Sequence, residues 1–284
     1  MFYIHGGDPL FQYGEGLYDL VQYLRDNDCD VNISTKGYIT KEIAKRLKSV
    51  KMRYLQISVD TYDNVVEKEL YPGLKPSLYQ MALQSIMHLI EVDIIPIVNI
   101  VITEYNYAQI PQLVTELLKN ENIQNISLSW YQKSINNMSD LQATPNHKSW
   151  LIKAMHNICA NNSGRLFFDM NRGILPEAKE RVVCANGRFK FLIFPDGKCG
   201  VCDFINQDER FIAGDIASQT IEEIWNSKAF KKIVYQRDEF LKNGTCKDCA
   251  GFDSCVERGV CYAEMLVKNN LEFGPDGQCK ECME

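Results

Sequence analysis

Cysteine is the residue type whose pattern in this sequence points most directly to chemistry. Two of the 11 cysteines, Cys29 and Cys159, stand alone in the first 183 residues. The other nine follow at short spacings: Cys184, Cys199, Cys202, Cys246, Cys249, Cys255, Cys261, Cys279 and Cys282. In a reducing compartment, clustered thiols are more often metal ligands than disulfides. We therefore expect the nine to bind metal, and the two isolated cysteines to be buried structural thiols.

The spacing of these nine thiols supports metal binding without choosing the metal. Three pairs have the C-x2-C spacing that places two thiolates on one ion or cluster. Two zinc ions or two 4Fe-4S clusters would each take four thiolates per site. The zinc alternative predicts a colourless protein without iron, whereas iron–sulfur clusters are brown.

The segments that would position further functional groups alternate between strands and helices. Short β-branched runs at 2–5, 31–34, 55–59, 94–102 and 126–130 are expected strands. Apolar residues recur at helical spacing near 17–24, 43–47, 78–89 and 110–117. This alternation predicts an α/β fold with a parallel sheet. Five strands predict an open or partial (β/α) barrel, because a closed eight-unit barrel would need about 250 residues by itself.

Polar sequences directly follow three of the expected strands. They are Gly6-Gly7-Asp8-Pro9, Ser34-Thr35-Lys36-Gly37 and Ser58-Val59-Asp60. Binding sites of parallel sheets lie at the carboxyl ends of the strands, so the three segments are expected to line one pocket. The alternative for each segment alone is ordinary turn chemistry, because Gly, Asp, Pro and Ser are common in any loop.

The sequence beyond the fifth expected strand changes character. Residues 131–183 are polar and Asn-rich, with one expected helix near 147–160, and we interpret them as a connection between two domains. A strand is expected at 188–194 and a turn at 195–198. The four histidines show no ligand spacing, so they are expected to be packing or surface residues.

Composition excludes several classes of partner. No apolar stretch is long enough for a membrane-spanning helix. The formal net charge of -6 and the lack of a basic block argue against nucleic acid binding. The first residues lack the basic and apolar regions of a secretory signal, which predicts a cytoplasmic protein.

The cysteine-rich region resembles the SPASM domain, the auxiliary cluster module of radical S-adenosylmethionine (SAM) enzymes. That family begins with C-x9-15-G-x4-C, which Cys184, Gly197 and Cys202 match. It continues with C-x2-C-x5-C-x3-C, which Cys246, Cys249 and Cys255 match. The next cysteine, Cys261, follows after five residues where the family pattern has three.

The resemblance implies two auxiliary 4Fe-4S clusters with interleaved ligands. The first cluster would use Cys184, Cys202 and Cys261, with Cys199 as the nearest candidate for the fourth position. The second would use Cys246, Cys249, Cys255 and either Cys279 or Cys282. One cysteine is then left over.

The resemblance extends to the polar strand ends in the first part of the chain. Gly6-Gly7-Asp8-Pro9 looks like the family's Gly-Gly-Glu-Pro motif, whose backbone meets the amino group of SAM. Ser34-Thr35 and Ser58-Val59-Asp60 look like its later strand ends, which border the methionyl and ribose parts of SAM. Candidate cofactor-binding residues are therefore Gly6, Gly7, Asp8, Pro9, Ser34, Thr35, Ser58 and Asp60.

One departure from the superfamily concerns the cluster that starts the reaction. The sequence contains no C-x3-C-x2-C motif, and its first expected strand corresponds to the family's second. We expect a chain that lacks one βα unit, and a third 4Fe-4S cluster only in a full-length form.

Asp203 directly follows Cys202 and is the candidate catalytic residue. In anaerobic sulfatase-maturing enzymes, which share the Cys-Asp-Phe tripeptide, an aspartate in this place is the proposed general base. The alternative is a solvated or turn-capping aspartate.

The resemblance implies an enzyme that oxidises or crosslinks a residue of a peptide or protein, served by an electron donor. The expected domains are a partial barrel at 1–130, a connection at 131–183 and a SPASM domain at 184–284. The alternative function is a non-catalytic iron–sulfur binding or electron-transfer fragment.

The division of the cysteines into ligands and structural thiols can be tested by substitution. Cys249→Ala should remove about half of the bound iron, because one of two clusters loses a ligand, whereas Cys29→Ala should remove none. Iron analysis of both variants measures this. Equal losses would contradict the division.

Overall fold

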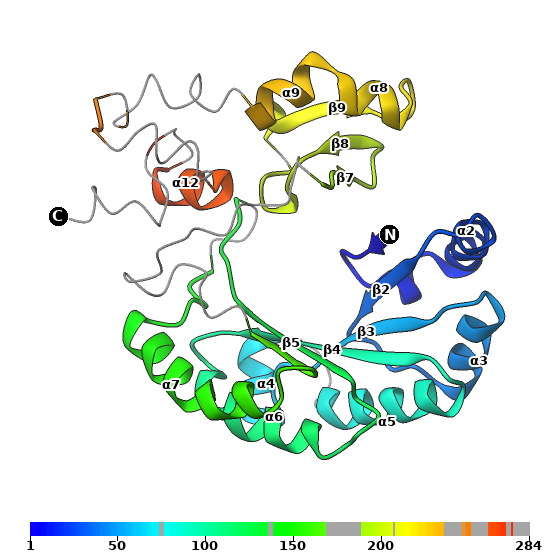
Figure 1. Cartoon of the computed structure of the whole chain (residues 1–284), viewed down its shortest axis with the longest axis vertical. Helices are drawn as coiled ribbons and strands as arrows, with labels where there is room; N and C mark the ends of the chain where they lie inside the picture. The colour runs from blue at the N-terminus through cyan, green and yellow to red at the C-terminus, as the bar shows by residue number, and fades with distance from the viewer. Residues whose placement is uncertain are drawn as a thin grey trace. The chain divides into compact units, whose positions relative to one another are not determined.

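The computed structural model describes residues 1–73, 77–135, 139–168, 189–206, 208–235, 246, 248–250, 261–270 and 274. The chain divides into two compact units (Figure 1). Unit 1 contains Met1–Tyr131 and Leu141–Met170, and unit 2 contains Gln132–Asp140 and Asn171–Glu284. No helix among the described residues is long and apolar enough to cross a membrane.

Unit 1 is built on a six-stranded parallel sheet. Its strands are β1 (Phe2–Ile4), β2 (Val31–Thr35), β3 (Tyr54–Ser58), β4 (Ile95–Ile102), β5 (Asn125–Trp130) and β6 (Leu166–Phe168). They pair in sequence order, each parallel to the next. Such an order requires a crossover in the same direction after every strand, which is how (β/α) barrels are wound. The predicted α/β fold and parallel sheet are confirmed.

Helices follow the strands and pack along one side of the sheet (Figure 1). In chain order they are α1 (Pro9–Gln12), α2 (Gly14–Asp26), α3 (Lys41–Ser49), α4 (Asn64–Leu70), α5 (Leu78–Glu91), the short 3₁₀ helix η1 (Tyr107–Gln109), α6 (Ile110–Leu118) and α7 (Pro145–Asn161). Local signals fix their starts. The Thr40 hydroxyl accepts the Ile43 N–H at 3.3 Å and caps α3, and Pro111 lies in the first turn of α6.

The two faces of this sheet differ in chemistry. On the face that packs on the helices, alternate residues are apolar and buried, among them Ile33, Leu55, Ile57, Val98, Ile100 and Leu128. Most alternate positions on the other face are polar and half-buried, and the register aligns Ser58 with Asn99 and Asn99 with Ser127. A parallel sheet covered by helices on both faces is apolar on both. The polar face is therefore the side on which a polar ligand can lie.

The segment expected to be a connection, 131–183, is organised differently in the structure. Residues 132–140 belong to unit 2, and the chain then returns to unit 1. There it forms α7 and then β6, which pairs with β5 as the sixth strand of the sheet. The sixth strand was missed because β6 has only three residues and follows a polar stretch. Hydrophobic periodicity gives a weak signal over so short a length.

Unit 2 contains a three-stranded antiparallel sheet of β7 (Leu192–Ile193), β8 (Lys198–Gly200) and β9 (Ile212–Asp215). The expected turn joins the first two strands: Phe194 N–H donates to Lys198 O at 2.8 Å, and Gly197 has a φ of +87° that favours glycine. The remaining elements are η2 (Asp203–Ile205), η3 (Glu209–Phe211), α8 (Ile221–Asn226), α9 (Lys228–Tyr235) and α12 (Tyr262–Lys268).

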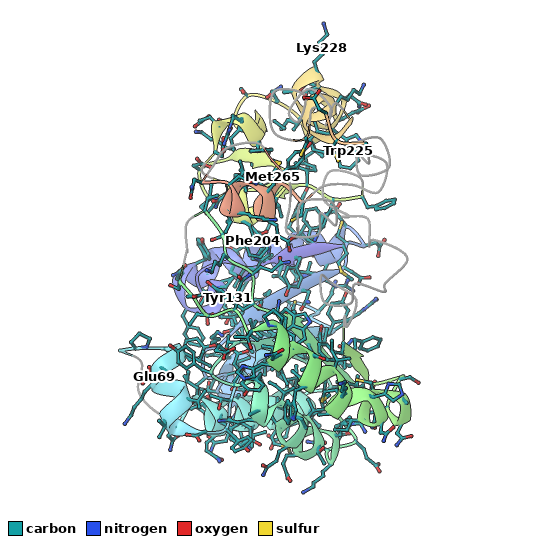
Figure 2. The ribbon with its side chains drawn as sticks, turned by 90° about the vertical axis from the view of Figure 1, so that its left-hand side faces the viewer. Glu69, Tyr131, Phe204, Trp225, Lys228 and Met265 are labelled. Atoms are coloured by element: carbon teal, nitrogen blue, oxygen red, sulfur yellow. The ribbon has the colours of Figure 1, made fainter. Side chains whose placement is uncertain are left out.

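A separate apolar core holds unit 2 together. Its fully buried members include Cys199, Ile205, Ile224 and Met265, and Trp225 packs against them (Figure 2). Thr220 and Glu223 form a capping box that fixes the start of α8.

The inward and outward positions of β4 give a stability test with a matched control. Ile100→Ala should lower the free energy of unfolding by about 2–5 kcal/mol, because a fully buried side chain leaves a cavity. Ile95→Ala, at a position 45% exposed in the same strand, should cost less than about 1 kcal/mol. Urea denaturation followed by circular dichroism measures both. Equal costs would contradict this arrangement of β4.

Candidate functional site

The structure joins the first two polar strand ends through the carboxylate of Asp8. This carboxylate accepts the Thr35 hydroxyl at 2.7 and 2.8 Å. It also accepts the backbone N–H groups of Lys36 and Gly37, each at 3.0 Å. Three donor groups hydrogen-bonded to one side chain fix the loop after β1 against the loop after β2.

The loop that carries Asp8 depends on its two glycines. Gly6 has φ +93° and Gly7 has φ +59°, in the left-handed region that residues with a Cβ rarely adopt. A Cβ at Gly7 would lie 2.3 Å from the Gln12 side-chain oxygen. Pro9 begins α1, where its missing N–H costs no hydrogen bond. These residues shape the loop, and Asp8 anchors it.

The third strand end is organised around the buried carboxylate of Asp60, whose side chain is 2% exposed. Its Oδ1 accepts the backbone N–H of Val101 at 2.7 Å. Its Oδ2 accepts the Lys36 ammonium at 2.6 Å and also the Tyr71 hydroxyl. A buried charge is tolerated only when it is paired and hydrogen-bonded, and both oxygens of Asp60 meet that condition.

Tyr71 keeps its proton in this network. Burial raises the pKa of the Tyr71 hydroxyl far above its ordinary value of 10.0, and the charge of Asp60 raises it further. The hydroxyl therefore donates to Asp60, while its oxygen accepts the Lys36 ammonium at 2.6 Å.

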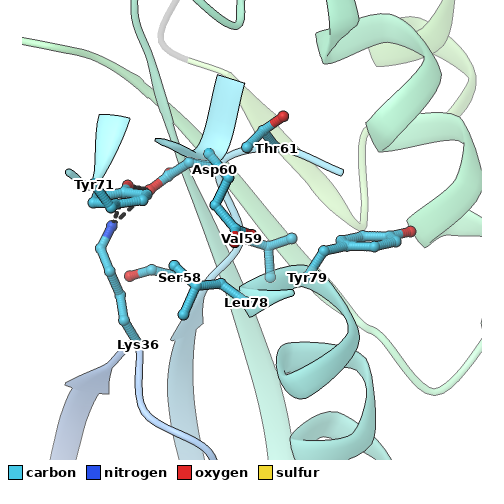
Figure 3. Close-up of a pocket in the computed structure, with 9 residues that line it drawn as sticks. Lys36, Ser58, Val59, Asp60, Thr61, Tyr71, Leu78 and Tyr79 are labelled. Atoms are coloured by element: carbon cyan, nitrogen blue, oxygen red, sulfur yellow. Dashed lines mark hydrogen bonds and ion pairs between the residues drawn. The ribbon is translucent and has the colours of Figure 1, made fainter. Parts of the chain in front are cut away.

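A pocket opens beside this network at the carboxyl edge of the sheet (Figure 3). It is lined by Lys36, Ser58, Val59, Asp60, Thr61, Glu67, Tyr71, Leu78 and Tyr79. Glu67 is buried and accepts the Ser77 N–H at 2.7 Å, at the start of α5. The pocket thus combines one cation, two buried carboxylates, hydroxyl groups and apolar walls.

The eight predicted cofactor-binding residues have different places in this arrangement. Ser58 and Asp60 line the pocket, whereas Asp8 and Thr35 join the neighbouring loops. Ser34 lies in a ladder across the polar face: its hydroxyl accepts Gln56 Nε2 at 3.0 Å, and Gln56 Oε1 accepts the Tyr3 hydroxyl at 2.6 Å.

Of the nine residues that line the pocket, only Ser58 and Asp60 were among the predicted site residues. The seven others include the charged and phenolic residues Lys36, Glu67 and Tyr71. Lys36 lies within the polar segment Ser34-Thr35-Lys36-Gly37, so the sequence could have indicated it as a pocket residue. Glu67 and Tyr71 come from α4 and the residue after it, and no spacing in the sequence relates them to Asp60.

The thiols of unit 2 are described only in part. The predicted ligands Cys184, Cys255, Cys279 and Cys282 lie outside the described residues. Three described cysteines from separate segments, Cys202, Cys246 and Cys261, pack against the same apolar core. Within the described part of the chain, no group of three or more His, Cys, Asp or Glu side chains is arranged to hold a metal ion.

Cys199, Cys249 and Asp203 complete the described site residues of unit 2. Cys199 is fully buried in β8, and burial raises the pKa of its thiol. The Cys249 N–H donates to Cys246 O at 3.2 Å, which closes a turn between these two thiols. Asp203 begins η2, with its Oδ1 3.9 Å from the sulfur of Cys202.

Cys29 and Cys159 lie in unit 1, partly buried against its apolar core. Burial raises the pKa of the Cys159 thiol, which disfavours the reactive thiolate. Both were expected to be buried, and the structure has them only partly so.

Residues 184–250 match the family model of SPASM, an iron–sulfur cluster-binding domain. No curated protein matches the sequence.

Solved structures share the fold over nearly the whole chain. One is anSMEcpe with bound AdoMet and the Cp18Cys peptide, with a TM-score of 0.69 and 16% identity over 98% of this chain and 80% of that one. Another is Streptococcus suis SuiB bound to S-adenosylmethionine, with a TM-score of 0.71 and 18% identity over 98% of this chain and 65% of that one. The SPASM match confirms the predicted resemblance of the cysteine-rich part to that domain, and the shared fold confirms the predicted architecture of the chain.

The anchoring role of Asp8 can be measured as stability. Asp8→Ala should lower the free energy of unfolding by about 1–3 kcal/mol, because the Thr35 hydroxyl and the Lys36 N–H lose their acceptor and the Gly37 N–H keeps only the Thr35 oxygen. Asp19→Ala, at an exposed position of α2, should change it by less than about 0.5 kcal/mol. Guanidinium denaturation compares the two variants. An Asp8→Ala variant as stable as Asp19→Ala would show that the two loops do not depend on this carboxylate.

Proposed function

From the SPASM match and the fold shared with structures that bind AdoMet, we propose that this chain works as a radical SAM/SPASM-type protein. It binds SAM at the carboxyl edge of the sheet and acts on a residue of a peptide or protein. The observation that carries the proposal is the coincidence of two independent features. One is the SPASM match in the cysteine-rich part, and the other is a polar pocket at the edge where parallel sheets bind ligands.

The pocket residues fit the chemistry of SAM. This cofactor joins an amino acid, a sulfonium ion and a nucleoside, so its site needs groups for charges of both signs, hydroxyl partners and apolar walls. The pocket combines the Lys36 cation, buried carboxylates, Ser58, and the side chains of Val59, Leu78 and Tyr79. The loop at Gly6, Gly7, Asp8 and Pro9 and the strand ends at Ser34, Thr35, Ser58 and Asp60 form the proposed cofactor edge.

SAM reduced by a 4Fe-4S cluster supplies the radical that takes a hydrogen atom from the substrate. The sequence contains no C-x3-C-x2-C motif to hold such a cluster. The work proposed for the described part of unit 1 is therefore to bind and orient the cofactor.

The thiols of unit 2 are proposed to hold two auxiliary 4Fe-4S clusters. The first would use Cys184, Cys202, Cys261 and Cys199, and the second Cys246, Cys249, Cys255 and one of Cys279 and Cys282. What supports this scheme is the packing of Cys202, Cys246 and Cys261 around one core, although they come from segments far apart in sequence. Soft thiolate donors suit iron–sulfur clusters and zinc alike.

Asp203 is proposed as the general base. Loss of a hydrogen atom and then of a proton from the substrate leaves one electron to be collected. Asp203, a carboxylate next to the proposed cluster ligand Cys202, could take the proton. An auxiliary cluster held by these thiols would supply an acceptor for the electron, and an external electron acceptor would then be needed to reoxidise it. The reducing conditions that these thiolates need support the cytoplasm as the proposed location.

A second candidate function is non-catalytic binding of iron–sulfur clusters or electron transfer. The absence of C-x3-C-x2-C favours it. The two candidate functions make different predictions for unit 1. The first requires that its pocket binds SAM, whereas electron transfer requires no SAM binding.

Anaerobic reconstitution with iron and sulfide tests the cluster assignment. The chain should take up about eight irons and show broad brown absorption, because each 4Fe-4S cluster holds four irons. Iron and sulfide analysis with an absorption spectrum measures both. A colourless protein that carries zinc would contradict the proposed function, and about four irons would contradict the count of two clusters.

A further inference from the structure

The polar face of the unit 1 sheet carries no charged side chain at any of its described strand positions. The alternate residues of β1–β6 that point away from the helices are tyrosine, asparagine, serine, glutamine, isoleucine, valine and phenylalanine. The charged residues Asp8, Lys36 and Asp60 lie in the loops beyond the strand ends. Lys36 and Asp60 also pair with each other. A ligand group on this face therefore meets dipoles and not free charges.

The polar groups of this face differ in whether they are already hydrogen-bonded. On β1–β3 they bind one another: the Tyr3 hydroxyl donates to Gln56, and Gln56 donates to Ser34. On β4 and β5, the side chains of Asn99 and Ser127 form no hydrogen bond with any other residue that the structure describes. Both are half-buried, and neither has a fully enclosed polar atom. An incoming ligand can bind these two side chains without breaking a hydrogen bond of the fold.

Asn99 and Ser127 belong to a row of residues that begins at the pocket. The register pairs Ser58 with Asn99 and Asn99 with Ser127, so the three lie side by side on β3, β4 and β5. Ser58 lines the pocket proposed for SAM. Neighbouring strands are about 4.8 Å apart, so a substrate group bound to Asn99 and Ser127 would lie roughly 5–10 Å from the pocket wall. That position is close to the cofactor whose radical has to reach the substrate.

The chemistry of these two side chains favours an amide as the bound group. The Asn99 carboxamide has an oxygen that accepts and an NH₂ that donates, and the Ser127 hydroxyl can do both. A ligand amide carries a donor and an acceptor at separate ends, so it can bind both side chains at once. A carboxylate or an ammonium group would leave water without finding a counter-charge, and a hydrocarbon would leave both side chains unpaired. The hydroxyls of Ser58 and Ser129 on the same face add hydrogen-bonding capacity but no charge.

We propose that Asn99 and Ser127 bind an uncharged amide group of the peptide substrate, and that the polar face excludes an ionised side chain from this position. The inference rests on the proposed function for the existence of a peptide substrate beside SAM. It adds two substrate-binding residues that were not predicted from the sequence, and it narrows the substrate to peptides with a neutral residue over β4 and β5. The amide can come from the peptide main chain or from an Asn or Gln side chain.

Four capped pentapeptides, Gly-Gly-X-Gly-Gly with Gln, Glu, Lys or Gly as X, test the inference. They are titrated by calorimetry into the reconstituted chain saturated with SAM. The Gln peptide should bind at least about tenfold more tightly than the Glu and Lys peptides, because their ionised side chains find no counter-charge. A Gly peptide that binds as tightly as the Gln peptide would assign the bound amide to the main chain, and one that binds more weakly would assign it to the side chain.

Two outcomes of this titration would overturn the inference: equal affinity for the Gln, Glu and Lys peptides, or binding of none of the four. A titration with SAM alone, made first, judges the proposed function separately. If SAM binds and the peptides are not discriminated, the inference falls and the cofactor pocket stands. If SAM does not bind, the proposed function falls and the inference falls with it.

Variants assign the selectivity to the two side chains. Asn99→Asp adds a charge with almost no change of shape, so it should weaken binding of the Gln peptide and strengthen binding of the Lys peptide, each by about tenfold. Asn122→Asp, the same change at an exposed position before β5, should leave all four affinities unchanged. Ser127→Ala removes a hydrogen-bonding group without adding a charge, and should weaken binding of the Gln peptide by about fivefold. It decides the question alone if Asn99→Asp does not fold. Unchanged peptide affinities in the folded variants would show that Asn99 and Ser127 do not contact the substrate.

Discussion

The buried carboxylate of Asp60 is the constraint on which the pocket of unit 1 depends. A charge with almost no exposure must be neutralised and fully hydrogen-bonded, and the groups that do this come from three parts of the chain. Val101 belongs to β4, Lys36 to the loop after β2, and Tyr71 to the residue after α4. Because all three must meet at one point, the carboxyl edge of the sheet is fixed in position. The Asp8 carboxylate fixes the loop after β1 in the same way, by hydrogen bonds to Thr35 and Lys36.

The difference between the two faces of the sheet explains how its carboxyl edge can serve as a ligand-binding site. The apolar face packs on the helices and provides the stability of unit 1. The polar face carries hydroxyl and amide groups at matching register positions in neighbouring strands. Unit 2 follows a different principle: its apolar core is small, and three of its cysteines pack directly against it. Metal binding by such thiols would add folding free energy to a core of that size.

Most of the fold of unit 1 could be predicted from the sequence because its signals are local. Five strands, the cap at Thr40 and the proline at the start of α6 follow from periodicity and from the chemistry of helix ends. The strand β6 was missed because three residues carry no usable period. The convergence of the polar strand ends could be expected from parallel topology, but the partners of Asp60 could not. Tyr71 and Val101 reach it through tertiary packing, which leaves no spacing in the sequence.

Hydrogen–deuterium exchange of the reconstituted chain, with and without SAM, tests the central claim that the carboxyl edge of the sheet is a cofactor site. Added SAM should slow exchange at residues 6–8, 35–37 and 58–61 and leave the outer helix α3 unchanged, because the ligand covers the strand ends and not the helical layer. Unchanged exchange in all three segments under saturating SAM would contradict the account.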